Sequence, residues 1–223
     1  MTFSIVSRCP RTGQFGAAVA SSSPAVASRC IRARRGVGAA ASQNITDPDL
    51  GPLALQAMAA GRTPAQALAD LQSRPFIEYR QLMAIDASNP PSVVTGTRCL
   101  GTIASAVGTH AACAGNMLAT RDIPAAMLAA FEAAEGPLAH RMMQAMLAGQ
   151  AAGGEEGPVH SAGLLVYGEL DWPIVDLRLD WVDADPVQAL DVVWKLYEPQ
   201  IEAYVTRARD PRAAPSFGVP GAR

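Results

Sequence analysis

Residues 2–21 read TFSIVSRCPRTGQFGAAVAS and predict an antiparallel hairpin at the start of the chain. Thr2–Ser7 is strand-like, and Phe15–Ser21 resumes an apolar strand after a short gap. Pro10–Gly13 supplies the turn, because proline fixes its own φ angle and glycine accepts a positive one. Two strands joined by so short a connection run in opposite directions. The stretch therefore favours an antiparallel sheet as the first unit of the fold.

Further strands are predicted downstream, and most of them are close neighbours in the sequence. After the first hairpin, Arg29–Arg35 reads as a basic loop, and a run of small residues follows it at Gly36–Gln43. A second hairpin is expected in the last third of the chain, beyond a glycine-rich loop at Gly153–Gly157. The expected strands are residues 79–86, 92–96, 102–107, 110–115, 161–167 and 174–179.

Helices separate these groups of strands. Thr63 before Pro64 is an N-cap followed by a proline in the first turn, where its missing N–H costs nothing. Asp185 and Pro186 repeat that signal before the last helix, which Pro199 is expected to kink. Strands clustered in hairpins argue against a doubly wound parallel sheet, so we predict an α+β fold with two antiparallel sheets covered by helices. The other expected helices are residues 52–60 and 123–150, the second interrupted at residues 136–137.

Composition limits the function classes. The chain has 223 residues, of which 49% are hydrophobic and 17% charged, as expected of one well-packed domain. We place this domain at residues 1–209 and a flexible tail, rich in proline, glycine and arginine, at residues 210–223. The formal net charge of −2 offers no long-range attraction to nucleic acid or to anionic lipid. We therefore expect neither of these as a partner.

The amino terminus and the cysteines indicate a cytoplasmic protein. MTFSIVSRC has neither the charged region nor the apolar region of a signal peptide, and apolar runs stay far below membrane-spanning length. The four cysteines are scattered without a C-x-x-C pair, which favours reduced thiols over disulfides or zinc. We expect no metal and no cofactor.

Several familiar motifs are present without their usual context. Gly36–Ala41 matches the dinucleotide pattern G-x-G-x-x-A, but no buried strand precedes it and no βαβ unit follows. Ser21–Ser23 lacks the glycines of a nucleophile elbow. Of the histidines, His140 reads as a surface residue, and His160 begins a strand at a position that suits the rim of a site. Lys195 is the only lysine, and its helical context indicates a solvated side chain.

Thr2 is the candidate nucleophile. A threonine hydroxyl attacks poorly unless a base lies beside it, and a terminal α-amine can be that base. The reference pKa of such an amine is about 7.7–8.0, so part of it is neutral at cellular pH. Thr2 becomes the first residue if Met1 is removed, as initiator methionine generally is before a small residue. By itself this pattern equally fits an ordinary strand residue.

Several segments of the chain stand out in combination: TFSIVSR (2–8), GQFGAAVAS (13–21), ARRGVGA (33–39), SQ (42–43), YRQ (79–81), TG (95–96), GN (115–116), EGPLA (135–139), GQAAGG (149–154), DLRLD (176–180) and DP (185–186). Together they resemble one bacterial family, domain of unknown function 1028, which is grouped with the N-terminal nucleophile (Ntn) hydrolases. The resemblance covers about residues 2–189.

The resemblance implies a four-layer αββα sandwich and a hydrolase that cleaves an amide bond in a small amide or peptide-like substrate. Thr2 is then the nucleophile, and Arg34, before G-V-G, holds a carboxylate or lowers the pKa of the amine. Arg29 and Arg32 are alternatives to Arg34 in the same segment. Asn116 is expected to donate to the oxyanion.

Two more residues are expected to orient the substrate. Gln43 and Asp176 are the candidates, with structural hydrogen bonding as the alternative role for them and for Arg34 and Asn116. The partner is expected to be a small-molecule substrate, and a homo-oligomer is left open. The alternative function is a non-catalytic ligand-binding or assembly protein on the same fold.

Overall fold

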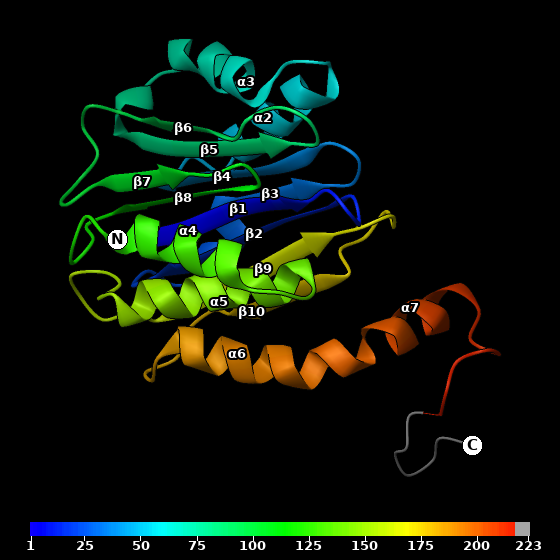
Figure 1. Cartoon of the computed structure of the whole chain (residues 1–223). Helices are drawn as coiled ribbons and strands as arrows, with labels where there is room; N and C mark the ends of the chain where they lie inside the picture. The colour runs from blue at the N-terminus through cyan, green and yellow to red at the C-terminus, as the bar shows by residue number, and fades with distance from the viewer. Residues whose placement is uncertain (217–223) are drawn as a thin grey trace.

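The predicted hairpin lies at the centre of the larger of two sheets in the computed structural model, which describes residues 1–216 (Figure 1). Every strand pairing in this six-stranded sheet is antiparallel, in the order β10-β9-β2-β1-β8-β7. Gly13 closes the hairpin turn with a φ of +66°, a conformation that glycine adopts without strain. The strands are β1 (Thr2–Cys9), β2 (Gln14–Ser21), β7 (Ala104–Val107), β8 (Ala111–Asn116), β9 (Ser161–Tyr167) and β10 (Val175–Leu179).

The second sheet has four antiparallel strands in the order β3-β4-β5-β6. They are β3 (Ile31–Arg34), β4 (Gly38–Asn44), β5 (Arg80–Asp86) and β6 (Ser92–Thr95). The prediction of a basic loop at residues 29–35 was wrong, because β3 and the end of a short helix, α1 (Val26–Cys30), occupy it. Ile31 and Ala33 of β3 pack on the core while Arg32 and Arg34 alternate outward.

Helices cover the outer faces of both sheets, which confirms the predicted sandwich. Figure 1 shows α2 and α3 beside the smaller sheet and α4, α5 and α6 beside the larger one. Thr63 caps α3 in a capping box with Gln66, as its sequence position indicates. Pro137 precedes α5 and accounts for the predicted interruption. The helices are α2 (Leu50–Ala59), α3 (Pro64–Asp70), α4 (Ile123–Ala133), α5 (Leu138–Ala151), α6 (Pro186–Tyr197) and α7 (Ile201–Arg209), with 3₁₀ turns η1 (Leu71–Ser73), η2 (Ile77–Tyr79) and η3 (Glu198–Gln200).

The space between the two sheets is filled by apolar side chains, many of them small. Alanines from four strands meet there, among larger apolar residues such as Val19, Met83 and Ile85. Small side chains allow two sheets to pack closely without voids. Separate apolar clusters lie under the helices on each outer face. Strand residues therefore alternate between an outer core and the interlayer core.

The C-terminal region follows its sequence signals in part. The turn η3 contains Pro199 and separates α6 from α7, as the predicted kink requires. Lys195 is exposed and pairs with Asp191 at 2.6 Å, in keeping with the expected solvated side chain. Of the predicted flexible tail, residues 210–216 form exposed turns for the most part, and residues 217–223 lie outside the described residues. Within residues 1–216, no helix is both long and apolar enough to cross a bilayer.

Candidate functional site

One end of the interlayer space is lined by polar side chains. Successive strand residues point to opposite faces, and Thr2 and Ser4 share the inward face of β1 with Val6 of the interlayer core. The same alternation on the neighbouring strands brings further polar residues to this end. All of them are at most 4% exposed. We call this region the polar end; its members are Thr2, Ser4, Ser21, Gln43, Gln81, Asn116 and Ser161.

Thr2 begins β1 and lies directly opposite Asn116 of β8 in the strand register. The side chain is buried, and its Oγ1 lies 3.5 Å from the Oγ of Ser21. Oγ1 also donates to the carbonyl oxygen of Met1. The predicted nucleophile therefore faces the interlayer space among polar groups rather than packing in an apolar core.

A chain of hydrogen bonds leads from Arg29 to this position. The Nη2 of Arg29 donates to the Oγ of Ser23 at 2.9 Å, and the Oγ of Ser23 lies 2.9 Å from that of Ser21. The backbone N–H of Ser23 also donates to the Oγ of Ser21, at 3.2 Å. The hydroxyl of Ser21 in turn donates to the carbonyl oxygen of Met1 at 2.5 Å.

The hydrogen bonds of this series are all donated in one direction, from Arg29 toward Met1. A serine hydroxyl has one proton to donate and two lone pairs that accept. Because Ser21 gives its proton to Met1, the bond between the two hydroxyls must be donated by Ser23. Arg29 has no lone pair and donates to Ser23 from the other side. The hydroxyl proton of Ser21 is thus directed at the carbonyl oxygen of Met1, in the peptide bond that joins Met1 to Thr2.

Asn116 has an unsatisfied side chain. The residue is fully buried, and neither its Oδ1 nor its Nδ2 has a hydrogen-bond partner in the described structure. An unpaired buried polar group costs about 1–3 kcal/mol, and such groups are uncommon in native proteins unless they have a role. The side-chain amide of Asn116 faces Thr2, and its free N–H can donate a hydrogen bond to a negative charge that develops beside the threonine.

Gln43, by contrast, is fully occupied by protein partners. Its Oε1 accepts from the hydroxyl of Ser4 at 2.5 Å. Its Nε2 donates to Oε1 of Gln81 at 2.8 Å and to the carbonyl oxygen of Ala114 at 3.3 Å. Within the polar end, the bonds to Ser4 and Ala114 join the two sheets, and the bond to Gln81 links β4 to β5 of the smaller sheet. The observed role of Gln43 is therefore structural, and its expected contact with substrate stays a prediction.

This contrast predicts opposite effects of two similar substitutions on stability. Asn116→Leu removes unpaired polar atoms and should leave the free energy of unfolding unchanged or raised. Gln43→Leu breaks three bonds and leaves their buried partners unpaired, which should cost on the order of 2 kcal/mol. Urea denaturation of both variants measures the difference. If Asn116→Leu destabilises as much as Gln43→Leu, Asn116 has structural hydrogen bonds after all.

The structure does not bring Arg34 to Thr2. Arg34 ends β3 opposite Gly38, and Gly38 pairs with Asp86 of β5. Oδ1 of Asp86 lies 3.8 Å from Nη1 of Arg8. Arg8 is six residues along β1 from Thr2. A strand rises about 3.3 Å per residue, so Arg34 lies about 20 Å from the polar end. The expectation that Arg34 acts on the amine of Thr2 was therefore wrong, since the register of β3 carries it to the other end of the sheets.

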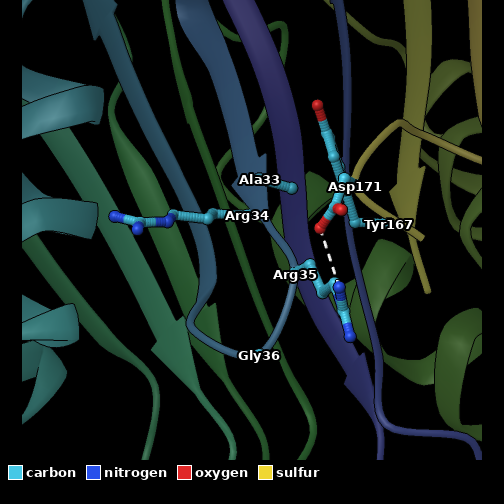
Figure 2. A pocket seen from close by; sticks show the side chains of 6 residues that line it. All are labelled: Ala33, Arg34, Arg35, Gly36, Tyr167 and Asp171. Atoms are coloured by element: carbon cyan, nitrogen blue, oxygen red, sulfur yellow. Dashed lines mark hydrogen bonds and ion pairs between the residues drawn. The ribbon is translucent and has the colours of Figure 1, made fainter. Parts of the chain in front are cut away.

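Arg34 borders a different cavity, of about 400 Å³, at that far end. Figure 2 shows its side chain pointing away from the pair formed by Arg35 and Asp171. That pair is 2.7 Å apart and largely exposed. Such a pair adds little to stability or specificity, because solvent screens it. The cavity is lined by Ala33, Arg34, Arg35, Gly36, Tyr167 and Asp171.

The alternatives to Arg34 behave differently from each other. Arg32 bonds the carbonyl oxygen of Ile31 at 2.7 Å and lies against Gly51 of α2, on the outer side of the smaller sheet. Arg29 reaches the polar end through Ser23, as described above. Of the three arginines considered from the sequence, only Arg29 is connected to Thr2.

Asp176 is also far from Thr2. It lies on β10, the edge strand separated from β1 by β9 and β2. Its carboxylate forms two bonds with Arg178, at 2.7 and 2.9 Å, and these bonds raise the pKa of Arg178. Alternation along the strand directs Val175 into the outer core and Asp176 to solvent. The expected role in orienting a substrate at Thr2 was wrong.

Glu155 was not singled out from the sequence, although it lies beside the polar end. It follows Gly153 and Gly154, whose φ angles are +121° and +58°. The carboxylate is 5% exposed and accepts the backbone N–H of Ser22 through both oxygens, at 3.2 and 3.1 Å. Burial raises the pKa of Glu155 to about 7, against the opposing effect of the amino terminus and the bonds from Ser22. The available signal was an acid within a glycine-rich loop.

The raised pKa predicts a pH dependence of stability. Between its ordinary value of 4.5 and about 7, the folded protein holds a proton on Glu155 that the unfolded chain has lost. Stability should therefore fall as pH rises through this window. Glu155→Gln should remove this part of the dependence, on the order of 2 kcal/mol between pH 5 and pH 8.

Thermal or urea unfolding at the two pH values checks this. Glu156→Gln, at the neighbouring residue, is the matched control. Equal pH dependence in wild type and Glu155→Gln would contradict the assignment.

His160 lies next to Ser21 through its backbone, which donates to the carbonyl oxygen of Ser21 at 2.9 Å. Its ring stacks on Trp181 with centroids 4.2 Å apart, and Nδ1 lies 3.0 Å from the carbonyl oxygen of Val182. The residue is half-buried. This placement agrees with the rim position suggested by the sequence.

Comparison with known proteins links the chain to one family. The model of "Family of unknown function (DUF1028)" matches residues 2–190. A crystal structure of a protein from Silicibacter pomeroyi, described with the same family, is 30% identical in sequence and superposes with a TM-score of 0.80. The match covers 89% of this chain and 88% of that one. No curated protein matches the chain.

Proposed function

The chain belongs to the DUF1028 family of unknown function, and from that premise we propose that it is an amide hydrolase of the Ntn type. Thr2 is the nucleophile, and removal of Met1 creates its free amine. The observation that carries the proposal is the position of Thr2: it is the first residue of a central strand, buried in the polar end, and opposite an asparagine whose side chain has no hydrogen-bond partner within residues 1–216.

The proposed reaction uses Thr2 twice. Its amine accepts the hydroxyl proton while Oγ1 attacks the carbonyl carbon of the substrate. The tetrahedral intermediate then collapses, the leaving amine takes the proton, and an ester on Oγ1 remains. Water hydrolyses this ester with the same amine as base, which releases the acid and restores the hydroxyl. Both steps balance without a cofactor.

Two groups of the polar end suit the developing oxyanion. Ser21 directs its hydroxyl proton at a carbonyl oxygen beside Thr2, and the amide of Asn116 has an unused donor opposite. Arg29 polarises Ser21 through Ser23, because each hydroxyl passes its proton toward the site. Loss of one such donor lowers the rate by about 10²–10³-fold in well-studied hydrolases. Ser21 and Arg29 thus join Asn116 in the role expected of it at the oxyanion, which differs from the carboxylate binding or amine tuning first expected of Arg34.

We propose a single catalytic domain at residues 1–209, acting in the cytoplasm on a small amide or peptide-like molecule. The experiment that tests the proposal is a panel of small amides and dipeptide-like compounds, incubated with protein that begins at Thr2. Release of free amine or ammonia is the measured product. No turnover of any compound would favour the alternative, a non-catalytic binding or assembly protein on this fold.

A further inference from the structure

Met1 occupies the space beside the hydroxyl of Thr2 in the unprocessed chain. Its carbonyl oxygen accepts hydrogen bonds from the hydroxyls of Thr2 and Ser21, the latter at 2.5 Å. The acyl carbon of Met1 is bonded to the nitrogen of Thr2, whereas the proposed ester carries its acyl carbon on Oγ1 of the same residue. An acyl group passes between these two atoms through a five-membered ring, so the two positions are adjacent. Met1 therefore marks the place where the acyl group of a substrate lies.

The side chain of Met1 lies against a glycine. A Cβ atom built on Gly157 would lie 3.2 Å from Cε and 3.7 Å from Sδ of Met1. The first of these distances is shorter than an ordinary contact between carbon atoms. A side chain at residue 157 would therefore crowd the methionine, and the glycine leaves the space open. An acyl group in the place of Met1 has room for an unbranched apolar side chain.

The α-amine of Met1 lies in the neighbourhood of Glu155. The carboxylate of Glu155 holds the backbone N–H of Ser22, and the hydroxyl of the preceding residue, Ser21, holds the carbonyl oxygen of Met1. The ammonium group of Met1 lowers the pKa of Glu155, against the larger opposing effect of burial. The carbonyl group and the amine of Met1 are therefore both served by this corner of the polar end.

Glu155 can accept a further cation. Its carboxylate is 5% exposed, and no lysine or arginine side chain within residues 1–216 forms an ion pair with it. A carboxylate has about four acceptor sites, and both oxygens of Glu155 share the single N–H of Ser22. Buried charges are ordinarily paired. Removal of Met1 takes its ammonium group away and vacates the space beside this carboxylate.

We propose that the space vacated by Met1 is the acyl subsite of the reaction at Thr2, and that it selects a substrate with a free α-ammonium group for Glu155 and an unbranched apolar side chain beside Gly157. The substrate class is then amides of α-amino acids and peptides with a free amino terminus. The inference rests on the hydrolysis proposed above and adds its specificity. Glu155 determines that specificity by contact with the substrate and takes no part in the bond changes.

The test uses protein that begins at Thr2 and three related amides, assayed at pH 7, where most of an α-amine is charged. Methioninamide has the ammonium group and the side chain. The compound 4-(methylthio)butanamide lacks only the amino group, and N-acetylmethioninamide has an uncharged nitrogen in its place. Hydrolysis of methioninamide consumes one water molecule and releases methionine and ammonia. Its kcat/KM should exceed those of the other two compounds by about ten- to hundredfold.

Glu155→Gln keeps the shape of the side chain and removes its charge. In this variant the ratio of kcat/KM between methioninamide and 4-(methylthio)butanamide should fall to near one. Glu156→Gln, at the exposed neighbouring residue, should keep the wild-type ratio. A wild-type ratio near one, or the same ratio in wild type and Glu155→Gln, overturns the assignment of Glu155 while amide hydrolysis at Thr2 stands.

Gly157→Leu tests the side-chain part of the subsite, because leucine fills the place of the methionine thioether. It should lower kcat/KM for methioninamide by about tenfold relative to that for glycinamide, which has no side chain. An unchanged ratio between these two amides overturns the position assigned to the substrate side chain.

Binding separates failure of this inference from failure of the proposed reaction. Thr2→Ala protein without Met1 cannot form the ester, so calorimetry measures affinity alone. It should bind methioninamide about ten- to hundredfold more tightly than 4-(methylthio)butanamide, and adding Glu155→Gln should abolish the difference. If this preference is present and wild type hydrolyses no amide, the subsite stands and the reaction at Thr2 does not. Equal or undetectable binding of the two compounds overturns the subsite.

Discussion

Thr2→Ala, in protein from which Met1 has been removed, should lose hydrolysis of every small amide that the wild type cleaves. The expected fall in rate is on the order of 10⁶-fold, as in other hydrolases that lose their nucleophilic hydroxyl. Alanine keeps the α-amine and removes only the attacking oxygen. The substitution therefore separates covalent catalysis from binding, and the Michaelis constant of any residual activity should change little.

Folding should survive this substitution. Thr2 is buried, but within residues 1–216 its hydroxyl forms only the long bond to Ser21 and the local bond to Met1, and the latter is lost on processing. The loss of stability should stay near 1 kcal/mol. Thr2→Ser, which retains the hydroxyl, is the matched control and should retain measurable turnover. Product release from the three proteins, at equal concentration and with thermal unfolding as a check, is the measurement. Turnover by Thr2→Ala at the wild-type rate would make Thr2 an ordinary strand residue.

Retention of Met1 should have an effect of similar size with no change in the catalytic residues. An amide nitrogen is not a base, so the hydroxyl of Thr2 has no proton acceptor in the unprocessed chain. The carbonyl oxygen of Met1 also takes the proton of Ser21 that we assign to the oxyanion. Protein released from a tag so that it begins at Met1 should therefore be inactive on substrates that the form beginning at Thr2 cleaves.

The comparison requires the two forms to share one fold. Treatment of the inactive form with a methionine aminopeptidase should restore activity in step with the loss of Met1, followed by mass. Equal activity of both forms would show that the amine has no part in the reaction, and it would exclude the Ntn mechanism even if Thr2→Ala were inactive.

Much of the fold was predictable because its strands are close in sequence. The hairpins of β1 with β2 and of β9 with β10 carry local turn signals, and the helices carry caps such as Thr63 and Asp185. β3 escaped prediction because it is four residues long and every second residue is arginine. On an edge strand, those arginines reach solvent while Ile31 and Ala33 face the core, so a charged pattern that reads as a loop forms a strand.

The residues of the candidate site were predictable only where the ends of paired strands lie side by side. Thr2 and Asn116 were both expected in it, and the register of β1 with β8 places them opposite each other. The position of Arg34 depends on the strand register of the other sheet, and that of Asp176 depends on the order of four strands. Neither register nor strand order can be predicted from local sequence. The place of Glu155 beside the site could not be predicted, because it depends on a glycine-rich loop that folds back onto Ser22.

Ser21 raises a different difficulty. Its place in the chain is that of an ordinary strand residue, and Ser22 and Ser23 beside it have the same side chain. Its chemistry follows from hydrogen-bond direction, since its proton goes to the carbonyl oxygen of Met1 and its oxygen accepts from Ser23. The direction of these hydrogen bonds arises from contacts between different elements, so no residue pattern in the sequence predicts it.

The most direct test of the central claim is the intact mass of the untagged protein from its own cells, combined with sequencing from the amino terminus. Thr2 must be the first residue for its hydroxyl and amine to act together. The account predicts a mass lower than that of the full chain by one methionine residue, and a first sequencing cycle that reads threonine. A mature protein that begins at Met1 would contradict it, because the proposed base would not exist.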